Sequence, residues 1–203
     1  MIRLLGVLLA ASALCGTVPA QVIEFESNGL KYLTLTRSGV TVMFAQLPIH
    51  IHGYAIVQAA VSNGAAGPYF IRPEDFTYVR SDGTEIRATP ARNVIAMLTQ
   101  KGSGSDVIKL VTTYEASVYG NSHFKSTNGY EQRRQAALAM TSTRLKAAAA
   151  ASALALVQAK LAPGDTTDGA VFFETEGKPL GPGHMLVRTN TDVFDFITGT
   201  PPE

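Results

Sequence analysis

Two histidines separated by one residue are the feature of this sequence that most suggests chemistry. They are His50 and His52, with Ile51 between them. Side chains at positions i and i+2 of a β-strand point to the same face, so two imidazoles placed in this way are able to hold one metal ion. A third ligand would have to be His123, His184 or a carboxylate. The sequence therefore predicts a candidate metal site at His50 and His52.

The same spacing also has a purely structural interpretation. Ile49 and Ile51 alternate with the histidines, so the isoleucines would face the core while His50 and His52 lie on the polar face of the strand. A pair of histidines on a strand is not a specific motif. Both interpretations stay open on the sequence alone, and no other cofactor is indicated.

Motifs of the common enzyme classes are absent from the sequence. It has no Gly-x-Ser-x-Gly nucleophile turn, no phosphate-binding loop ending in Gly-Lys-Ser/Thr and no His-Glu-x-x-His zinc motif. Glu174 and Glu176 would share a strand face, as paired catalytic carboxylates do. Charges that keep an edge strand from aggregating explain this pair with fewer assumptions. We expect a protein that is not an enzyme and has no catalytic residues.

The N-terminal residues 1–20 have the pattern of a secretory signal peptide. Arg3 gives a positive start, an apolar run from Leu4 to Leu14 follows, and small residues lead to a cleavage site after Ala20. This run is shorter than the roughly 20 residues that a membrane-spanning helix needs. We therefore expect export to the periplasm or the extracellular space, with no transmembrane span in the mature chain.

Cys15 offers a competing route of processing, as the lipidated cysteine of a bacterial lipoprotein. Such a cysteine normally follows a small residue, and Leu14 is not small. Cleavage after Ala20 would remove Cys15, the only cysteine, so the mature chain would form no disulfide. A cysteine-free exported chain fits a bacterial envelope better than a small extracellular eukaryotic domain, which usually carries disulfides.

Length and charge place further limits on the protein. Of 203 residues, positions 21–203 are enough for one domain with an embellishment. Arg3 is one of 17 basic residues, so its removal leaves a balance with the 16 acidic residues. Without a basic excess, nucleic acid is not an expected partner.

Short strands separated by glycine turns are predicted before residue 90 and after residue 163. Asn28-Gly29 between two alternating runs is the strongest hairpin signal, because both turn residues tolerate positive φ. Strands at this spacing indicate an antiparallel sandwich or barrel. The expected strands are 22–26, 30–36, 40–44, 49–53, 54–62, 70–71, 75–79, 168–174, 184–188 and 193–197.

A helical insertion near residues 90–162 interrupts these strands. Apolar residues recur at helical spacing over 93–100 and again over 107–118. The largest expected element is one long Ala-rich helix from Tyr130 to Ala162, because alanine has the highest helix propensity. Pro163 ends this helix.

The composition of the predicted long helix also indicates how it packs. Five consecutive alanines at 147–151 give no apolar stripe, so their burial requires a close approach to another element, to the sheet above all or else to another helix. Leu154, Val157 and Leu161 follow one helical face, and we expect them to be the main anchors.

Three motifs in the β parts carry a resemblance to a known family. They are Val61-Ser62-Asn63, then Pro73-Glu74-Asp75-Phe76 followed by Asp82-Gly83, and Pro163-Gly164 before Gly169-Ala170-Val171-Phe172-Phe173. In this order they resemble bacterial exported immunoglobulin-like domains, including telokin-like ones, many of which have no known activity. The resemblance covers the β parts, roughly half of the chain after residue 20, and implies an immunoglobulin-like sandwich.

The sequence therefore predicts a mainly β fold with an α insertion, an antiparallel immunoglobulin-like sandwich forming a single domain over 21–203. Its expected role is an exported, non-enzymatic binding or structural domain of the bacterial cell envelope with a protein partner there. The alternative is a metal-binding protein or metalloenzyme that uses His50 and His52.

Overall fold

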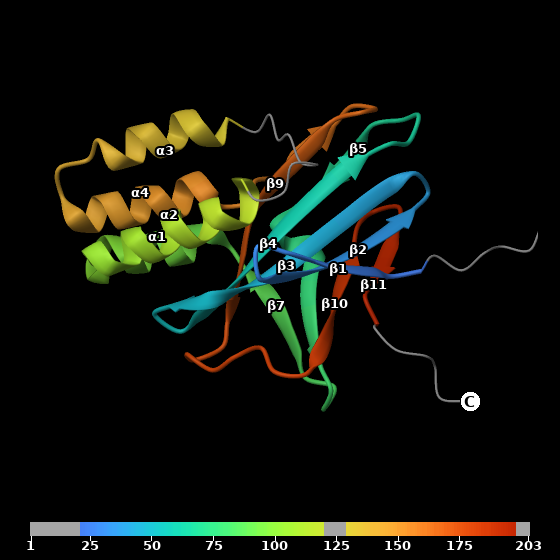
Figure 1. Cartoon of the computed structure of the whole chain (residues 1–203), viewed down its shortest axis with the longest axis horizontal. Helices are drawn as coiled ribbons and strands as arrows, with labels where there is room; N and C mark the ends of the chain where they lie inside the picture. Colours follow the sequence, from blue (N-terminus) through green and yellow to red (C-terminus); the bar gives the residue numbers. More distant parts are fainter. Residues whose placement is uncertain (1–20, 120–128, 198–203) are drawn as a thin grey trace, which may run out of the picture.

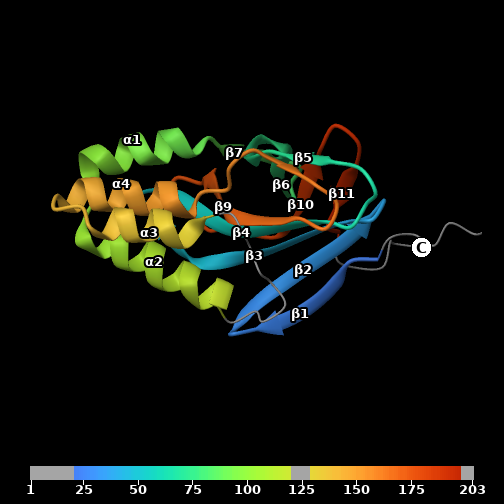
Figure 2. The same cartoon turned by 90° about the horizontal axis from the view of Figure 1, so that it is seen from above.

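The computed structural model describes residues 21–119 and 129–197. The predicted signal peptide at 1–20, with Cys15, therefore lies outside the described residues. The described chain is mostly β, with a large curled sheet and the helices gathered at one end of it (Figures 1 and 2). None of the helices in the described ranges is long and apolar enough to cross a membrane.

The elements follow one another as strands, then helices, then strands. A 3₁₀ turn spans Pro73–Asp75, and the helices are α1 (Ala91–Lys101), α2 (Gly104–Tyr119), α3 (Tyr130–Leu138) and α4 (Thr143–Leu154). The strands are β1 (Ile23–Ser27), β2 (Leu30–Arg37), β3 (Val40–Ile51), β4 (Tyr54–Asn63), β5 (Tyr69–Ile71), β6 (Phe76–Arg80), β7 (Glu85–Thr89), β8 (Ala159–Leu161), β9 (Thr166–Glu174), β10 (Gly183–Arg188) and β11 (Val193–Asp195).

Nine of these strands form one antiparallel sheet in the order β1-β2-β3-β4-β9-β7-β6-β10-β11, and β5 pairs with β8 beside it. Strands from before and after the helices are neighbours, since β9 lies between β4 and β7 and β10 pairs with β6. The predicted mainly β, antiparallel fold with a helical insertion is thus confirmed. The sheet curls into a half-barrel, so the immunoglobulin-like sandwich is not confirmed and stays a prediction.

Tight two-residue turns connect the first four strands. Both residues of each turn have positive φ, which gives the type I′ geometry that matches the twist of paired strands. The first turn confirms the predicted Asn-Gly hairpin, and the third places a histidine in a turn. The three turns are Asn28-Gly29, Ser38-Gly39 and His52-Gly53.

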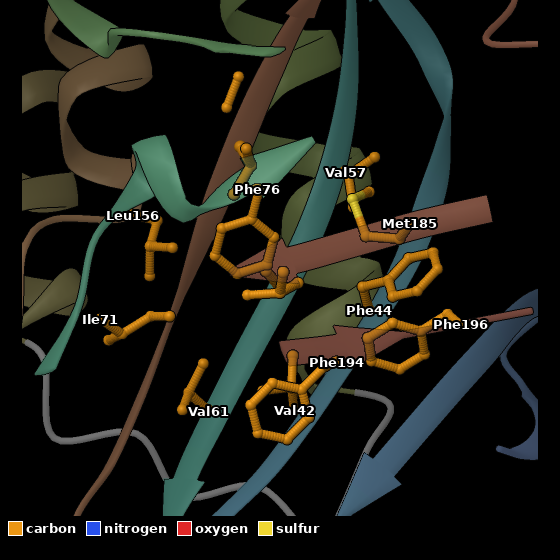
Figure 3. Close-up of a cluster of buried hydrophobic side chains, with 14 of the residues drawn as sticks. Val42, Phe44, Val57, Val61, Ile71, Phe76, Leu156, Met185, Phe194 and Phe196 are labelled. Atoms are coloured by element: carbon orange, nitrogen blue, oxygen red, sulfur yellow. The ribbon is translucent and has the colours of Figure 1, made fainter. Parts of the chain in front are cut away.

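The concave face of the half-barrel encloses the larger hydrophobic core (Figure 3). Alternate residues of β3 and β4 point into it, among them Phe44 and Val57, and the curled sheet brings Met185 and Phe196 over from its far end. The rings of Phe44 and Phe196 meet edge to face with centroids 4.9 Å apart. This contact links the two ends of the sheet and stabilises the curl.

The convex face of β3, β4 and β9 is covered by the helices, which share a second core with it. Ile56 and Phe172 from the sheet pack with Leu98 of α1, Leu110 of α2 and Leu154 of α4. Because all five side chains are at most 2% exposed, the helices are an integral layer of the fold and not a projecting arm.

The predicted single helix from Tyr130 to Ala162 is wrong. Helix α3 ends at Leu138, and Ser142 has an extended backbone with φ −76° and ψ 126° before α4 begins. Serine and threonine side chains compete for backbone hydrogen bonds inside a helix, so residues 141–143 favour an interruption. As a result α3 folds back beside α4 (Figure 1).

The end of the predicted helix also differs, because α4 stops at Leu154 and Leu161 belongs to β8. Leu154 and Leu161 are buried as expected, but Val157 is 46% exposed. The alanines of α4 are buried by close approach to α1. A Cβ added to Gly102, just after α1, would lie 2.9 Å from the Cβ of Ala147.

Candidate functional site

The two histidines of the predicted metal site do not share a strand face. His50 is on β3, opposite Ala55 of β4, whereas His52 is the first residue of the β3–β4 turn with φ 46°. The Nε2 atom of His52 donates a hydrogen bond to Oδ2 of Asp106 in α2, at 3.0 Å. The Nε2 atom of His50 is buried and has no hydrogen-bond partner in the described part of the chain.

The structure offers no third ligand for this pair among the described residues. Across 21–119 and 129–197, no group of three or more His, Cys, Asp or Glu side chains is placed to hold a metal ion. His184 is engaged elsewhere, with its Nε2 3.2 Å from Oδ1 of Asp195, and His123 lies outside the described residues. Metal binding at His50 and His52 therefore stays a prediction.

Asp106 belongs to a capping box that starts α2. Its Oδ2 accepts hydrogen bonds from the backbone N–H of Ser103 at 2.8 Å and from the Ser103 hydroxyl at 2.7 Å. The Ser103 hydroxyl lies 3.3 Å from the backbone nitrogen of Asp106, which completes the reciprocal pattern. Burial raises the pKa of Asp106, but the hydrogen bonds from Ser103 and His52 outweigh it and hold that pKa below its usual value.

This cluster of His52, Asp106 and Ser103 is a structural clamp. The serine hydroxyl donates to the carboxylate and not to the imidazole, so the cluster lacks the serine–histidine contact of a nucleophilic triad. The clamp holds the tip of the β3–β4 hairpin against the N-terminus of α2. The Ser-x-x-Asp spacing at 103–106 is the signal in the sequence that indicates the cap.

A second buried polar pair joins α2 to the sheet. The hydroxyl of Tyr114 donates to Oδ2 of Asp168 on β9 at 2.5 Å, and both residues are at most 3% exposed. Burial and the neighbouring Asp168 carboxylate raise the pKa of Tyr114 well above its usual value, so the phenol keeps its proton and remains the donor. We interpret this pair as an anchor for the helical layer.

The paired carboxylates Glu174 and Glu176 are not arranged as the sequence suggested. Glu174 is the last residue of β9, and Glu176 takes a positive φ of 54° in the turn that follows. The two residues therefore do not share a strand face. Their geometry gives no support to glycosidase-like chemistry.

A cavity of about 460 Å³ opens at one mouth of the half-barrel and is the strongest candidate site. One wall is the start of β2 with the adjacent part of β3, and the other is β6 with the start of β10 and the loop before it. Its lining combines apolar side chains with a few polar ones. The lining residues are Leu30, Leu33, Phe44, Pro48, Pro182, Met185, Lys31, Gln46, Tyr78 and His184, with Gly29, Gly181 and Gly183 between them.

Strand register places the floor of this cavity. Leu33 pairs with Phe44 across β2 and β3, and Met185 pairs with Tyr78 across β10 and β6. Phe44, Tyr78 and Met185 are buried members of the concave core, so the cavity is an opening onto that core. Apolar ligand atoms placed there would contact core side chains on both walls.

The loop before β10 is held in place by two specific features. The Tyr78 hydroxyl donates to the backbone carbonyl of Gly181 at 2.6 Å. Burial raises the pKa of Tyr78, while Arg80 acts in the opposite direction, so the hydroxyl remains a donor at neutral pH. A Cβ on Gly183 would overlap the backbone carbonyl of Val79, so only glycine fits at this position. The rim of the cavity is thereby preformed.

The charged groups of the cavity lie at its rim. Lys31 is paired with Glu24 at 2.7 Å, and the two side chains are 63% and 47% exposed. His184 is paired with Asp195. Among the described residues that line the cavity, none is aspartate or glutamate.

No family model, curated protein or solved structure matches the chain. The interpretation of the site therefore rests on its geometry. The cavity was not predicted from the sequence. Its walls come from strands far apart in the chain, and a Gly/Pro-rich turn over 176–183 was the only local signal.

Proposed function

We propose that this protein is an exported, non-enzymatic binding domain of the bacterial cell envelope, and that its ligand site is the cavity between β2–β3 and β6–β10. Export rests on the signal-peptide pattern of residues 1–20. The non-enzymatic role rests on the absence of catalytic motifs from the sequence. A protein partner in the envelope stays a prediction.

The cavity is the observation that carries the binding function. Its volume of about 460 Å³ lies within the range of roughly 300–1,000 Å³ typical of small-molecule sites. It joins a buried apolar floor to a few polar groups at the rim, which is the usual composition of a ligand pocket. The fixed loop at Gly181 and Gly183 further supports a preformed site.

The proposed kinship with immunoglobulin-like domains has more limited support. The two parts of the curled sheet, β1-β2-β3-β4-β9 and β7-β6-β10-β11, face each other across the concave core, as the layers of a sandwich do. They are joined by the short pairing of β7 with β9 at Ala88 and Thr89. The kinship is therefore a proposal about descent and not about activity.

The binding function is tested with N-phenyl-1-naphthylamine, a neutral fluorophore whose emission rises in an apolar site. The purified protein should bind it saturably with one site per chain. Leu33→Trp places an indole in the mouth of the cavity and should abolish this binding. Thr36→Trp is the matched control, because Thr36 is an exposed residue of the same strand and does not line the cavity.

The result that would overturn the proposed function is also defined by this pair of variants. If the fluorophore does not bind saturably, or binds equally well to both tryptophan variants, the cavity is not a ligand site. Circular dichroism of each variant confirms that the fold is retained before binding is compared.

Export has its own test, the intact mass of the protein purified from the envelope. The chain should begin at Gln21. A lipid-modified Cys15 at the N-terminus would show that the lipoprotein route is used instead.

A further inference from the structure

We infer that the cavity at the mouth of the half-barrel takes a small amphipathic anion, a compact apolar body carrying one acidic group, with Lys31 contacting the acid. This inference rests on the proposed binding function and adds the class of ligand. It follows from the distribution of charge, burial and hydrogen bonds over the lining residues.

The lining includes one permanent positive charge, that of Lys31, whose partner Glu24 is not itself a lining residue. Lys31 and His184 come from opposite walls, and no aspartate or glutamate is among the described lining residues. The exposed Gln46 adds an amide that is able to donate. An anionic group of a ligand would therefore meet donors and one permanent positive charge.

Lys31 is available to a ligand because its present ion pair is weak. Lys31 and Glu24 are both largely exposed, and such pairs are solvated and contribute little. Exchange of the Glu24 carboxylate for a ligand carboxylate or sulfonate therefore costs little. His184 is less available, since Asp195 already occupies its Nε2.

The depth of the residues sets the orientation of the ligand. Phe44 and Met185 on the floor are 7% and 0% exposed, whereas the Lys31 side chain at the rim is 63% exposed. An apolar body gains most by replacing water against the floor, and an acidic group loses least by staying at the rim. The Tyr78 hydroxyl already donates a hydrogen bond to the carbonyl of Gly181, so it is not free to donate to a ligand on the floor of the cavity.

Two fluorophores of similar size separate the charge from the apolar body. The anion 8-anilinonaphthalene-1-sulfonate and the neutral N-phenyl-1-naphthylamine share a fused aromatic body and differ in the sulfonate. With the wild-type protein at low salt, both should bind saturably at the same site and compete. Raising the salt concentration should weaken binding of the anion only.

Reciprocal variants test the role of Lys31. Lys31→Gln should weaken binding of the sulfonate by about threefold, the effect of one exposed charge pair. Glu24→Gln removes the carboxylate that competes for Lys31, so this substitution should strengthen binding of the sulfonate. Neither substitution should change binding of the neutral fluorophore, and Lys109→Gln, on the exposed face of α2, should change neither probe.

The outcomes distinguish this inference from the proposed function. If the neutral fluorophore binds in the cavity but Lys31→Gln leaves sulfonate binding unchanged, the inference is overturned and the ligand site stands. If Lys109→Gln weakens sulfonate binding as much as Lys31→Gln, the effect is one of net charge and the inference is again overturned. If neither fluorophore is displaced by Leu33→Trp, the proposed function itself has failed.

Discussion

The close contact between Gly169 and the chain leaving α4 gives a sharp test of the fold. Gly169 lies on β9, opposite Ala59, and a Cβ added to it would overlap the backbone of Leu156. That backbone is fixed by a hydrogen bond from the Leu156 N–H to the carbonyl of Ala170 at 2.9 Å. Gly169→Ala therefore cannot be accommodated by turning a side chain, and the segment at Ala155 and Leu156 must move away from β9.

The cost of that movement can be estimated from the contacts that it breaks. The lost hydrogen bond contributes about 1 kcal/mol, and partial exposure of Leu156, which is 2% exposed, costs about 1–3 kcal/mol more. We expect Gly169→Ala to lower the free energy of unfolding by about 2–4 kcal/mol, measured by urea denaturation. The sum overlaps the range of about 1–3 kcal/mol that is typical of overpacked cores and extends to its upper side.

Gly67→Ala is the matched control for this substitution. Gly67 is not among the glycines with positive φ, and an added Cβ would meet nothing within 4 Å. Its effect should lie between no change and a gain of about 1 kcal/mol, since alanine restricts the unfolded chain. A loss below about 0.5 kcal/mol in Gly169→Ala would mean that the α4 exit does not lie on β9 as described.

Three further predictions concern the core, the clamp and the histidine pair. Leu161→Ala should lower the free energy of unfolding by about 2–5 kcal/mol. Val157→Ala, at an exposed position four residues earlier, should lower it by less than about 0.5 kcal/mol. Equal losses in urea denaturation would contradict the placement of β8. Asp106→Asn should destabilise the protein at pH 7 by about 0.5–2 kcal/mol, the usual value of a helix cap. Because the pKa of Asp106 is lower in the folded protein than in the unfolded chain, its contribution is present above the unfolded value of about 3.9 and is lost as the pH falls through the folded value. The difference between wild type and Asp106→Asn should therefore shrink from pH 7 to pH 3, and a difference that stays constant would refute the role of the carboxylate. Elemental analysis of the purified protein and of His50→Ala tests the metal-binding alternative: a stoichiometric metal that is lost in His50→Ala would establish it, and a protein purified with no stoichiometric metal would refute it.

Local signals in the sequence predicted the first hairpin and most of the strands, but they missed β7 and β8 and divided β3 in two. Asn28-Gly29 determines its turn through backbone preferences of two adjacent residues, and this information is entirely local. The helix expected over 93–100 corresponds to α1, because its apolar spacing matches the face that packs on the sheet. In both places local preference and tertiary packing agree.

The failures occurred where local preference and tertiary packing differ. Alanine propensity favoured a continuous helix through 141–143, but folding α3 back onto α4 buries Ala137 and Ala150 in the second core. His52 was assigned to a strand because apolar residues continue on both sides of it, yet Gly53 beside it permits the two-residue turn. The turn allows β3 and β4 to pair along most of their length.

The cavity could not be predicted, since its existence depends on the curl of the sheet. Leu33 and Met185 line the same space although about 150 positions separate them, and no local pattern indicates that β10 would pair with β6. The rim pairs lie across other strand pairs, Lys31–Glu24 across β1 and β2 and His184–Asp195 across β10 and β11. Residue types alone identified neither pair.

The helical segment leaves the sheet and returns to it at almost the same place, beside β9. Thr89, just before α1, pairs with Phe172 of β9, and Ala155, just after α4, forms a bridge with Ala170 of the same strand. A short connection between these two points would preserve the order of all nine strands. The convex face at Ile56 and Phe172 would then be uncovered. Removing the helices would therefore keep the order of the strands. It would also expose the apolar side chains that the helices cover, so a shortened chain would need polar residues at those convex positions to stay soluble.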